Sequence, residues 1–550
     1  MGAPIRLGDL LKEKGLVNDA QIEFALQVQK VTGEKLGQTL TKIGIVSEFD
    51  LAQCVSEQLG LEHVDLEKIQ PDLEILKRFN RNTCLNQRIF PIKKEGDKVI
   101  VATSDLPGQR MEQTIRRTVG MRPHFVLSEE SKVVSAIYNY FYFLDNPIEQ
   151  LIEREINILA SDATFTIDPD NFITLLLLYA IKYRATDIHI KPMPQGINIA
   201  FRIDGVLNSM LFLPPSLMRI ITAIKLQAGM DISEQRLPQD GRWTVSLLEK
   251  RYDIRASSIV TPYGENLVLR LLSQERVNFS LEGLGFFPED IEKIKEIFKE
   301  PYGIVLLTGP TGAGKSTTLV AGLMTLDLLS KNVLTVENPI EYIVPLARQT
   351  QVNLAAGYNF SRAMPSFLRH DPDIILIGEM RDEETARTAF VAATTGHLVL
   401  STLHSNTALG AIPRLKGLGM DTLTISESLI AVISQRLVRT ICPHCIYKYT
   451  PEQWEIEYLG QKVDTLWKGK GCKFCNNTGY FGRTLIYEAL FISKNFRIAL
   501  EQEKESFELE KIAINDGFKS MFEIGVKKVI DGFTTVEELQ RVVGKYKYLR

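Results

Sequence analysis

The sequence predicts an α/β protein of several domains, and three observations support this expectation. The chain of 550 residues is long enough for several domains of about 100–200 residues each. Short apolar runs rich in Val and Ile alternate with stretches of helical periodicity, a pattern typical of sheets covered by helices. One of these runs, residues 304–308, leads into a glycine-rich segment with the spacing of a phosphate-binding loop.

The composition is that of a globular protein and excludes several classes. A formal net charge of −3 gives no general attraction to nucleic acid or to anionic membranes. The first 26 residues carry many charged side chains, unlike a signal peptide. The most apolar run, residues 172–181, has about half of the roughly 20 residues that span a bilayer. We therefore expect a soluble, cytoplasmic protein that does not bind nucleic acid.

The first 60 residues contain two copies of a 29-residue unit. Each copy predicts a short helix, a glycine that ends it and a longer helix. The equivalent positions are Arg6, Leu7, Gly8, Leu11 and Gln29 in the first copy and Lys35, Leu36, Gly37, Leu40 and Gln58 in the second. Polar side chains duplicated beside glycines suit a ligand that is itself two-fold, such as a cyclic dinucleotide. A purely structural helical domain is the alternative.

We expect four parts along the chain. Residues 1–143 form an N-terminal regulatory domain, in which a small α/β unit follows the helical repeat. Residues 144–171 form a linker helix and loop, and residues 172–280 form a middle domain of strands and helices. Residues 281–550 form the nucleotide-binding domain, with C-terminal helices and a cysteine-containing element at 440–480.

The middle domain carries arginines where its expected strands meet their loops. A single surface arginine is by default a solvated charge. Several beside a nucleotide-binding domain suggest guanidinium groups that stabilise a transferring γ-phosphoryl group. We expect Arg255 and Arg270 to contact phosphate directly, with Arg236 and Arg242 next.

The glycine-rich segment predicts a phosphate-binding loop between a strand and a helix. Its glycines allow the backbone to approach phosphate oxygens closely. Lys315 is expected to reach the β- and γ-phosphates, and Ser316 to place its hydroxyl on Mg²⁺. The chain is therefore expected to bind ATP or GTP. The loop residues are Gly309, Pro310, Thr311, Gly312, Ala313, Gly314, Lys315, Ser316 and Thr317.

Two carboxylates and two histidines follow or flank other expected strands. Glu337 ends the strand at 333–336, and we expect it to position or deprotonate the attacking water. Glu379 is assigned to Mg²⁺, because we expect its strand to lie next to the strand of the phosphate loop. His397 and His404 bracket a further strand, which suggests a sensor of the γ-phosphate.

Four of the six cysteines form two C-x₂-C pairs. Four thiolates in two such pairs suit tetrahedral Zn²⁺ with no open coordination position, which is typical of a structural site. The expected zinc ligands are Cys442, Cys445, Cys472 and Cys475.

The motifs GPTGAGKST, VENPIEY, DPDIILIGEMRD, TTGHLVLSTLHSN and RLPQDGR together resemble those of the secretion and pilus assembly ATPase superfamily. They are similar to those of type II secretion ATPases and type IV pilus extension ATPases. The front repeat resembles the cyclic-di-GMP-binding N-terminal repeat domain of some of these proteins. The cysteine element is typical of extension and secretion ATPases rather than retraction ATPases.

This resemblance implies a RecA-like motor domain and a PAS-like middle domain that lends arginines to a neighbouring active site. It implies a homohexamer that uses ATP, Mg²⁺ and Zn²⁺ to assemble pilins in a type IV pilus, under cyclic-di-GMP control. The protein would be peripheral at the inner membrane, reaching it only through an inner-membrane platform protein and a cytoplasmic partner. Alternatives are a type II secretion ATPase and a weakly hydrolysing, nucleotide-gated signalling scaffold.

One residue departs from the family pattern. Asn338 follows Glu337 where the family usually has Asp. If that Asp only supports the loop, Asn can hydrogen-bond in its place. If it holds Mg²⁺, affinity or rate should fall, which would favour the scaffold.

Overall fold

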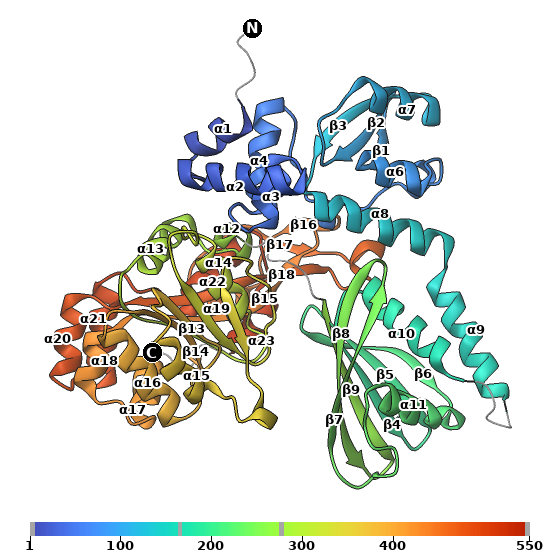
Figure 1. Cartoon of the computed structure of the whole chain (residues 1–550). Helices are drawn as coiled ribbons and strands as arrows, with labels where there is room; N and C mark the ends of the chain where they lie inside the picture. The colour runs from blue at the N-terminus through green and yellow to red at the C-terminus, as the bar shows by residue number, and fades with distance from the viewer. Residues whose placement is uncertain (1–5, 163–167, 274–279, 545–550) are drawn as a thin grey trace. The chain divides into compact units, whose positions relative to one another are not determined.

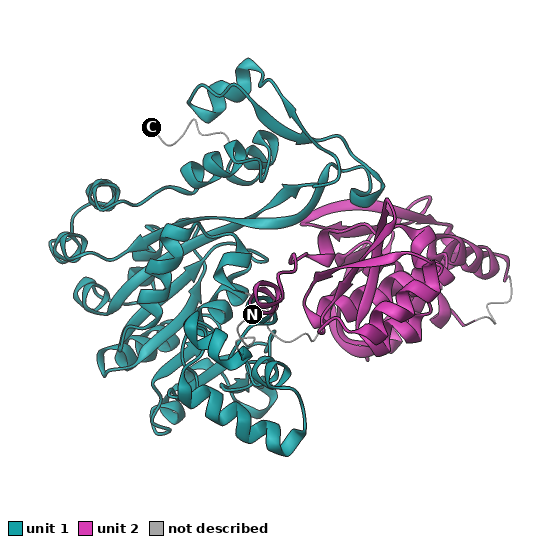
Figure 2. Ribbon diagram, turned by 90° about the horizontal axis from the view of Figure 1, so that it is seen from above, with its two compact units in different colours: residues 1–51, 276–550 teal, residues 52–275 magenta. Residues whose placement is uncertain are grey.

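The computed structural model (Figure 1) describes residues 6–162, 168–273 and 280–544. By its internal contacts the chain divides into two units, one of residues 1–51 and 276–550 and the other of residues 52–275 (Figure 2). The boundary at residues 51 and 52 falls inside one helix. The two units are described separately, and the four-part division expected from the sequence stays a prediction.

The front repeat forms two pairs of helices. Their bounds are α1 (Leu7–Glu13), α2 (Asp19–Thr32), α3 (Leu36–Lys42) and α4 (Glu48–Leu59). Gly15 and Gly44 follow the short helices with φ of 68° and 78°, where glycine avoids the clash of a Cβ atom. Asn18 caps α2, and the Ser47 hydroxyl accepts the Asp50 amide at the start of α4. The 29-residue repeat is thus a repeat of structure.

The second unit begins with a small three-stranded sheet of order β1-β2-β3. Strands β1 and β2 are antiparallel, and β2 and β3 are parallel. This sheet and its helices form the small α/β unit expected after the helical repeat. The elements are η1 (Leu66–Lys68), α5 (Leu73–Leu76), α6 (Arg81–Gln87), β1 (Ile89–Glu95), β2 (Lys98–Thr103), α7 (Gln109–Val119), β3 (Arg122–Leu127), α8 (Glu130–Asp145) and α9 (Ile148–Ser161).

The rest of the second unit is a six-stranded antiparallel sheet of order β6-β5-β4-β9-β8-β7. Its elements are α10 (Asp170–Lys182), β4 (Ala185–Met193), β5 (Gly196–Ile203), β6 (Val206–Leu213), η2 (Pro215–Met218), α11 (Arg219–Gln227), β7 (Gln239–Leu247), β8 (Lys250–Thr261) and β9 (Gly264–Ser273). Asp204 and Gly205 have φ of 48° and 85° and form the hairpin turn between β5 and β6. Apolar side chains of the strands, α10 and α11 share one core, so one face of the sheet is covered by helices.

The first unit is built around a seven-stranded sheet of order β12-β11-β13-β14-β10-β15-β18. All neighbouring pairs are parallel except β15 and β18. The strands are β10 (Gly303–Thr308), β11 (Val333–Glu337), β12 (Arg348–Gln351), β13 (Ile374–Ile377), β14 (Leu398–Leu403), β15 (Leu429–Ile441) and β18 (Tyr480–Phe491). Alternate residues of β10 belong to two different apolar cores, because helices cover both faces of the sheet (Figure 1).

The helices of this unit connect and cover the strands. They are α12 (Leu281–Leu284), α13 (Pro288–Phe298), α14 (Lys315–Leu323), η3 (Leu354–Ala356), α15 (Phe360–Phe367), α16 (Glu383–Thr394), α17 (Ala411–Gly417), α18 (Thr422–Ser428), α20 (Lys494–Glu501), α21 (Ser506–Asn515), α22 (Met521–Ile530) and α23 (Val536–Val543). Between β15 and β18 lie β16 (Ile446–Tyr449), α19 (Gln453–Leu459), β17 (Leu466–Gly469) and η4 (Lys473–Cys475). None of the helices within the described ranges is both long and apolar enough to cross a membrane.

Candidate active site

The phosphate-binding loop lies where the sequence predicts it, between β10 and α14. Gly309, Gly312 and Gly314 have φ of 134°, 77° and 83°, values that side chains with a Cβ atom rarely adopt. A Cβ atom on Gly309 would also lie 2.3 Å from the carbonyl oxygen of Gln435. Helix α14 begins at Lys315, so the unpaired amides of its first turn face the same edge of the sheet as the loop.

Lys315 is held over the loop and lies near carboxylates. Its Nζ donates to the carbonyl oxygens of Gly309 at 2.8 Å and of Pro310 at 3.1 Å. Burial lowers the pKa of Lys315, while the charges of Glu379 and Glu341 raise it. A phosphate oxygen is a stronger acceptor for this ammonium group than a carbonyl oxygen. The arrangement therefore suits exchange of the two carbonyl contacts for a nucleotide phosphate.

Glu337 occupies the last position of β11, and its side chain is held in place. It is 8% exposed. Its Oε1 accepts hydrogen bonds from the Thr335 hydroxyl at 2.6 Å and from the Gln349 side-chain amide at 2.9 Å. Burial raises the pKa of Glu337, the two hydrogen bonds lower it and the charge of Glu341 adds to the increase. A carboxylate with a raised pKa binds a proton more readily, as a general base must.

Glu379 lies just beyond the end of β13. Its Oε2 pairs with the Arg381 Nε at 2.7 Å, and the Nε2 of His404 lies 3.7 Å from the same oxygen. One sequence expectation was wrong: β14, and not β13, pairs with β10. The strand of Glu379 is therefore one place removed from the loop. Because all these strands are parallel, its carboxylate still reaches the edge that carries Lys315.

Only one of the two expected histidines lies at this edge. His404 follows the carboxyl end of β14, whereas His397 precedes its amino end, and β10 and β14 are parallel. The six residues of β14 span about 20 Å at roughly 3.3 Å per residue. The Nδ1 of His397 lies 2.9 Å from the Ala392 carbonyl oxygen. His397 lies between the end of α16 and the start of β14, so the structure corrects its expected place beside the phosphate loop.

Asn338 has no hydrogen bond within the described ranges, and it is exposed. The support for the loop that an Asn might give at this position is therefore not present in this chain. The carboxylate of Glu337 is held instead by Thr335 and Gln349.

Several residues of the site were not found from the sequence. Thr335 shares a face of β11 with Glu337, and strand alternation could have shown this. Gln349 comes from β12, and no local pattern places that edge strand beside β11. Arg381 pairs with Glu379, and the charge of Glu341 acts on Lys315. Nothing in the sequence distinguishes these two charged residues from others on the surface.

The donors at this edge fit Mg²⁺. The Ser316 hydroxyl at the start of α14 and the Glu379 carboxylate offer the oxygen ligands that Mg²⁺ prefers, and phosphate oxygens supply others. Arg381 pairs with the same carboxylate through an exposed side chain, so this ion pair can open without breaking a core contact. Ser316 and Glu379 would be the residues that hold the ion.

The four expected zinc ligands form one cluster. Their Sγ atoms all lie within 4.8 Å of one another, and three of the separations are 3.7, 3.8 and 3.9 Å. Four sulfurs about 2.3 Å from a tetrahedral zinc ion are about 3.8 Å apart. The backbone amides of Cys472 and Gly479 donate to the Cys475 sulfur. The donor set and its spacing fit structural zinc.

The six-stranded antiparallel sheet presents a row of charged residues on neighbouring strands. Arg242 lies opposite Arg255, Arg255 opposite Arg270, Arg270 opposite Asp187, and Asp187 opposite Arg202. Residues directly opposite one another lie on the same face of a sheet. We call these five residues the arginine row. It includes three of the four arginines named from the sequence.

The arginine row is only partly neutralised. Arg270 donates to Asp187 at 3.0 Å, and the Arg255 Nε lies 3.6 Å from Asp253. Arg236 is outside the row and pairs with Glu234 in an exposed loop. The structure therefore places Arg242, Arg255 and Arg270 side by side on one face of the sheet and does not bring Arg236 to them.

The residues expected to bind a cyclic dinucleotide divide into exposed and buried sets. Arg6 and Lys35 are exposed and precede α1 and α3 with nearly the same φ and ψ, −65° and 143° against −70° and 147°. Leu11 and Leu40 are fully buried, so they pack in the core of the repeat, and a ligand contact at these two positions stays a prediction. Partly exposed positions are Leu7, Gly8, Gln29, Leu36 and Gln58, whereas Gly37 is buried.

The Gly8 and Gly37 positions lie where α1 and α3 meet. A Cβ atom on Gly8 would lie 3.7 Å from Leu36, and one on Gly37 would lie 3.4 Å from Leu7. This reciprocal packing relates the two copies. The Gln29 side chain donates to the Glu34 carbonyl oxygen at 2.7 Å, so it ties α2 to the segment that begins the second copy.

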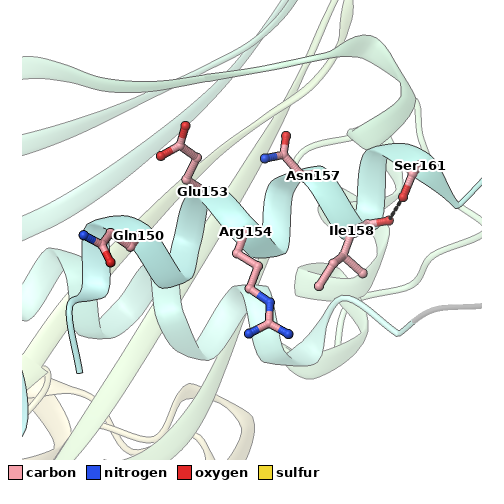
Figure 3. Close-up of a pocket in the computed structure, with 6 residues that line it drawn as sticks. All are labelled: Gln150, Glu153, Arg154, Asn157, Ile158 and Ser161. Carbon is pink, nitrogen blue, oxygen red and sulfur yellow. Dashed lines mark hydrogen bonds between the residues drawn. The ribbon is translucent and has the colours of Figure 1, made fainter. Parts of the chain in front are cut away.

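A surface hollow of about 480 Å³ lies along α9 and contains no predicted site residue. All the side chains that line it come from this one helix (Figure 3). They are Gln150, Glu153, Arg154, Asn157, Ile158 and Ser161. One helix face with mixed charges does not enclose a ligand.

Comparisons with known proteins agree with this geometry. Residues 168–541 match the family model described as type II/IV secretion system protein, and residues 59–146 match the MshEN domain. The type IV pilus assembly ATPase PilB of Myxococcus xanthus is 35% identical over 97% of this chain and 98% of its own length. Type II secretion system protein E of Klebsiella pneumoniae is 43% identical over 67% of this chain and 75% of its own length.

One solved structure shows the same fold. The Legionella pneumophila ATPase DotB has a TM-score of 0.53 and 22% identity, and the similarity covers 69% of this chain and 96% of DotB. The family match covers well over half of the chain, from residue 168 to residue 541. The chain therefore belongs to the family of type II/IV secretion system proteins.

Proposed function

We propose that this protein hydrolyses ATP to drive the assembly of pilins into a type IV pilus. The observation that carries the proposal is the convergence of Lys315, Glu379 and Glu337 at one edge of a parallel sheet, beside the phosphate-binding loop. The choice of pilus assembly is supported by the Myxococcus relative, which matches 97% of this chain, including the N-terminal region. Type II secretion is a second candidate, because the Klebsiella relative is 43% identical over the 67% of this chain that it matches.

The chain's own residues divide the work of hydrolysis. The loop amides and Lys315 bind the phosphates, and Lys315 exchanges its contacts with Gly309 and Pro310 for phosphate oxygens. Glu337 orients the attacking water and accepts its proton. Bound Mg²⁺ would neutralise charge on the phosphates, and Ser316 and Glu379 would hold it. His404, whose Nε2 lies 3.7 Å from the Glu379 carboxylate, would contact the γ-phosphate.

The arginine row supports a shared active site. Arg255 and Arg270, with Arg242 beside them, offer planar donors that suit phosphate oxygens. We propose that they act on a nucleotide bound by another copy in a hexameric ring, where they stabilise charge on the transferring group. The ring would work with membrane machinery through a platform protein and a partner in the same assembly. In the N-terminal region, Arg6 and Lys35 would bind cyclic-di-GMP as a regulator.

Two variants of the active site should lose hydrolysis in different ways. Lys315→Ala should lose nucleotide binding, because the ammonium group supplies a charge-assisted contact. Glu337→Gln should retain binding but lower kcat by about 10²–10⁴-fold, the usual contribution of a general base. Phosphate release and nucleotide titration measure the two effects. The control Glu384→Gln changes an exposed carboxylate on α16 and should have normal activity. Full turnover by both active-site variants would rule out this site.

The pH dependence of hydrolysis should depend on Thr335. Its hydroxyl lowers the pKa of Glu337 by stabilising the carboxylate. Thr335→Val removes this hydrogen bond at nearly constant volume, so the pKa of Glu337 should rise and the acid limb of the kcat profile should move to higher pH. Thr335→Ser keeps the hydroxyl and should have the wild-type profile. An unchanged acid limb in the Val variant would contradict the assignment of Glu337 as base.

The cysteine cluster should bind about one zinc ion per chain. Cys445→Ser should lower the zinc content measured by elemental analysis, and it should lower the unfolding temperature because the insertion between β15 and β18 loses its cross-link. Cys84→Ser removes a buried cysteine outside the cluster and should keep the zinc. Equal zinc content in the wild type and Cys445→Ser would disprove the site.

Binding of cyclic-di-GMP should require the residues that precede α1 and α3. Arg6→Ala removes a guanidinium group from one of two equivalent positions and should weaken binding by about tenfold or more, since hydrogen bonds to charged groups contribute about 1.5–3 kcal/mol. Calorimetry measures the affinity. Lys30→Ala removes the same charge from an exposed site on α2 and should bind normally. Equal affinity of Arg6→Ala and the wild type would count against the repeat as the binding site.

A further inference from the structure

A buried glutamine lies beneath the phosphate-binding loop. Gln435 is on β15 and is fully buried. Its Nε2 donates to the Ala313 carbonyl oxygen of the loop at 2.7 Å. Strands β10 and β15 pair as far as Thr308 and Ser434. Gln435 is therefore the next residue along β15 and lies under the point where the chain leaves β10 to form the loop.

Gln435 contacts the loop at its beginning as well as at its end. A Cβ atom on Gly309 would lie 2.3 Å from the Gln435 carbonyl oxygen, and one on Gly314 would lie 3.4 Å from Nε2. The backbone of this residue thus supports the first glycine of the loop. Its side chain supports the last two residues before α14. A single residue of the neighbouring strand fixes both ends of the phosphate-binding segment.

The Gln435 side chain lowers the stability of the fold, because one of its polar atoms is buried without a partner within the described ranges. The Oε1 of Gln435 is buried and has no hydrogen-bond partner among the described residues. A buried acceptor left without a partner costs about 1–3 kcal/mol, so an apolar side chain of the same length would suit the core better. An unsatisfied buried group calls for a specific explanation, and function is a common one. The group that makes a contact is Nε2, and its acceptor is in the phosphate-binding loop.

The geometry of the peptide bond links this contact to the nucleotide. In a planar trans peptide, the carbonyl of one residue and the N–H of the next point in opposite directions. The Ala313 carbonyl points toward the Gln435 side chain, so the Gly314 N–H points away from Gln435, the side left open to a phosphate. Amides on that side are the donors to phosphate in such loops. Rotation of this peptide would remove one of them.

We propose that Gln435 is a positioning residue for ATP binding, which fixes the Ala313–Gly314 peptide so that its N–H faces the phosphates. This inference rests on the proposed function, because it assumes that the loop binds a nucleotide. It adds a residue from outside the loop and outside the acidic motifs. Gln435 touches no reacting atom and acts only through the backbone of the loop.

The test is nucleotide binding by full-length Gln435→Met. Methionine fills a similar volume but cannot donate to the Ala313 carbonyl. We expect ATP and ADP to bind about fivefold more weakly, the effect of one net hydrogen bond. In hydrolysis assays KM for ATP should rise by a similar factor while kcat stays close to the wild-type value, the pattern of lost uniform binding. Gln435→Leu also lacks a donor for this carbonyl and should weaken binding by a similar factor.

Two measurements separate positioning from folding. Ser434→Ala removes a neighbouring buried hydroxyl whose contact is with Asn406 rather than the loop, and it should bind ATP normally. In nucleotide-free protein, hydrogen exchange of Gln435→Met should increase at residues 310–315 and stay unchanged in β10 and β15. A general fold defect would raise exchange in the strands as well.

The outcomes are distinct. Wild-type affinity of Gln435→Met for ATP and ADP would overturn the inference while leaving the proposed function intact. Loss of the nucleotide-free fold in both Gln435 variants would show that the residue serves the fold, and would also overturn it. Failure of the wild-type protein to bind either nucleotide would instead refute the proposed function.

Discussion

The parallel pairing of β11, β13, β14 and β10 is the constraint on which the candidate active site depends. Parallel strands in register bring their carboxyl ends to one edge of the sheet. Here that edge carries the phosphate-binding loop, Glu337, Glu379 and His404, which are separated by up to 95 residues in the sequence. The side chains converge because hydrogen bonds between buried backbones fix the strand ends. No direct contact between these side chains is needed to bring them together.

Burial at this edge changes the chemistry of the charged groups. Removal of water disfavours the ionised form of Glu337 and of Lys315, and their neighbours oppose this effect to different extents. Glu337 is held by a hydroxyl and an amide, while Lys315 relies on two carbonyl oxygens and the field of nearby carboxylates. A bound triphosphate would give the Lys315 ammonium group an anionic partner in place of two neutral carbonyl oxygens. The site is thus arranged around an anion.

The six-stranded antiparallel sheet also carries positive charges with too few negative partners. Arginines directly opposite one another on neighbouring strands repel and lower stability. Asp187 is the one acidic residue of the arginine row, and it pairs with Arg270. Asp253 lies outside the row, beside Arg255. A set of guanidinium groups with too few carboxylates is most stable when an anion binds. This imbalance is the physical reason to regard the row as a phosphate-binding surface rather than as ordinary surface charge.

The sequence by itself determined the features that depend on local chemistry. The glycine spacing of the loop, the cysteine pairs and the 29-residue repeat each depend on residues close together in the chain, and the structure places all three as expected. Tertiary structure alone decided the strand order, which put β14 rather than β13 beside β10 and left His397 at the opposite end of its strand. It also brought Thr335, Gln349 and Gln435 to their acceptors and buried Leu11 and Leu40. Pairing between distant strands decides such contacts, because the hydrogen bonds and the packing that select a neighbour are made only when the whole sheet forms.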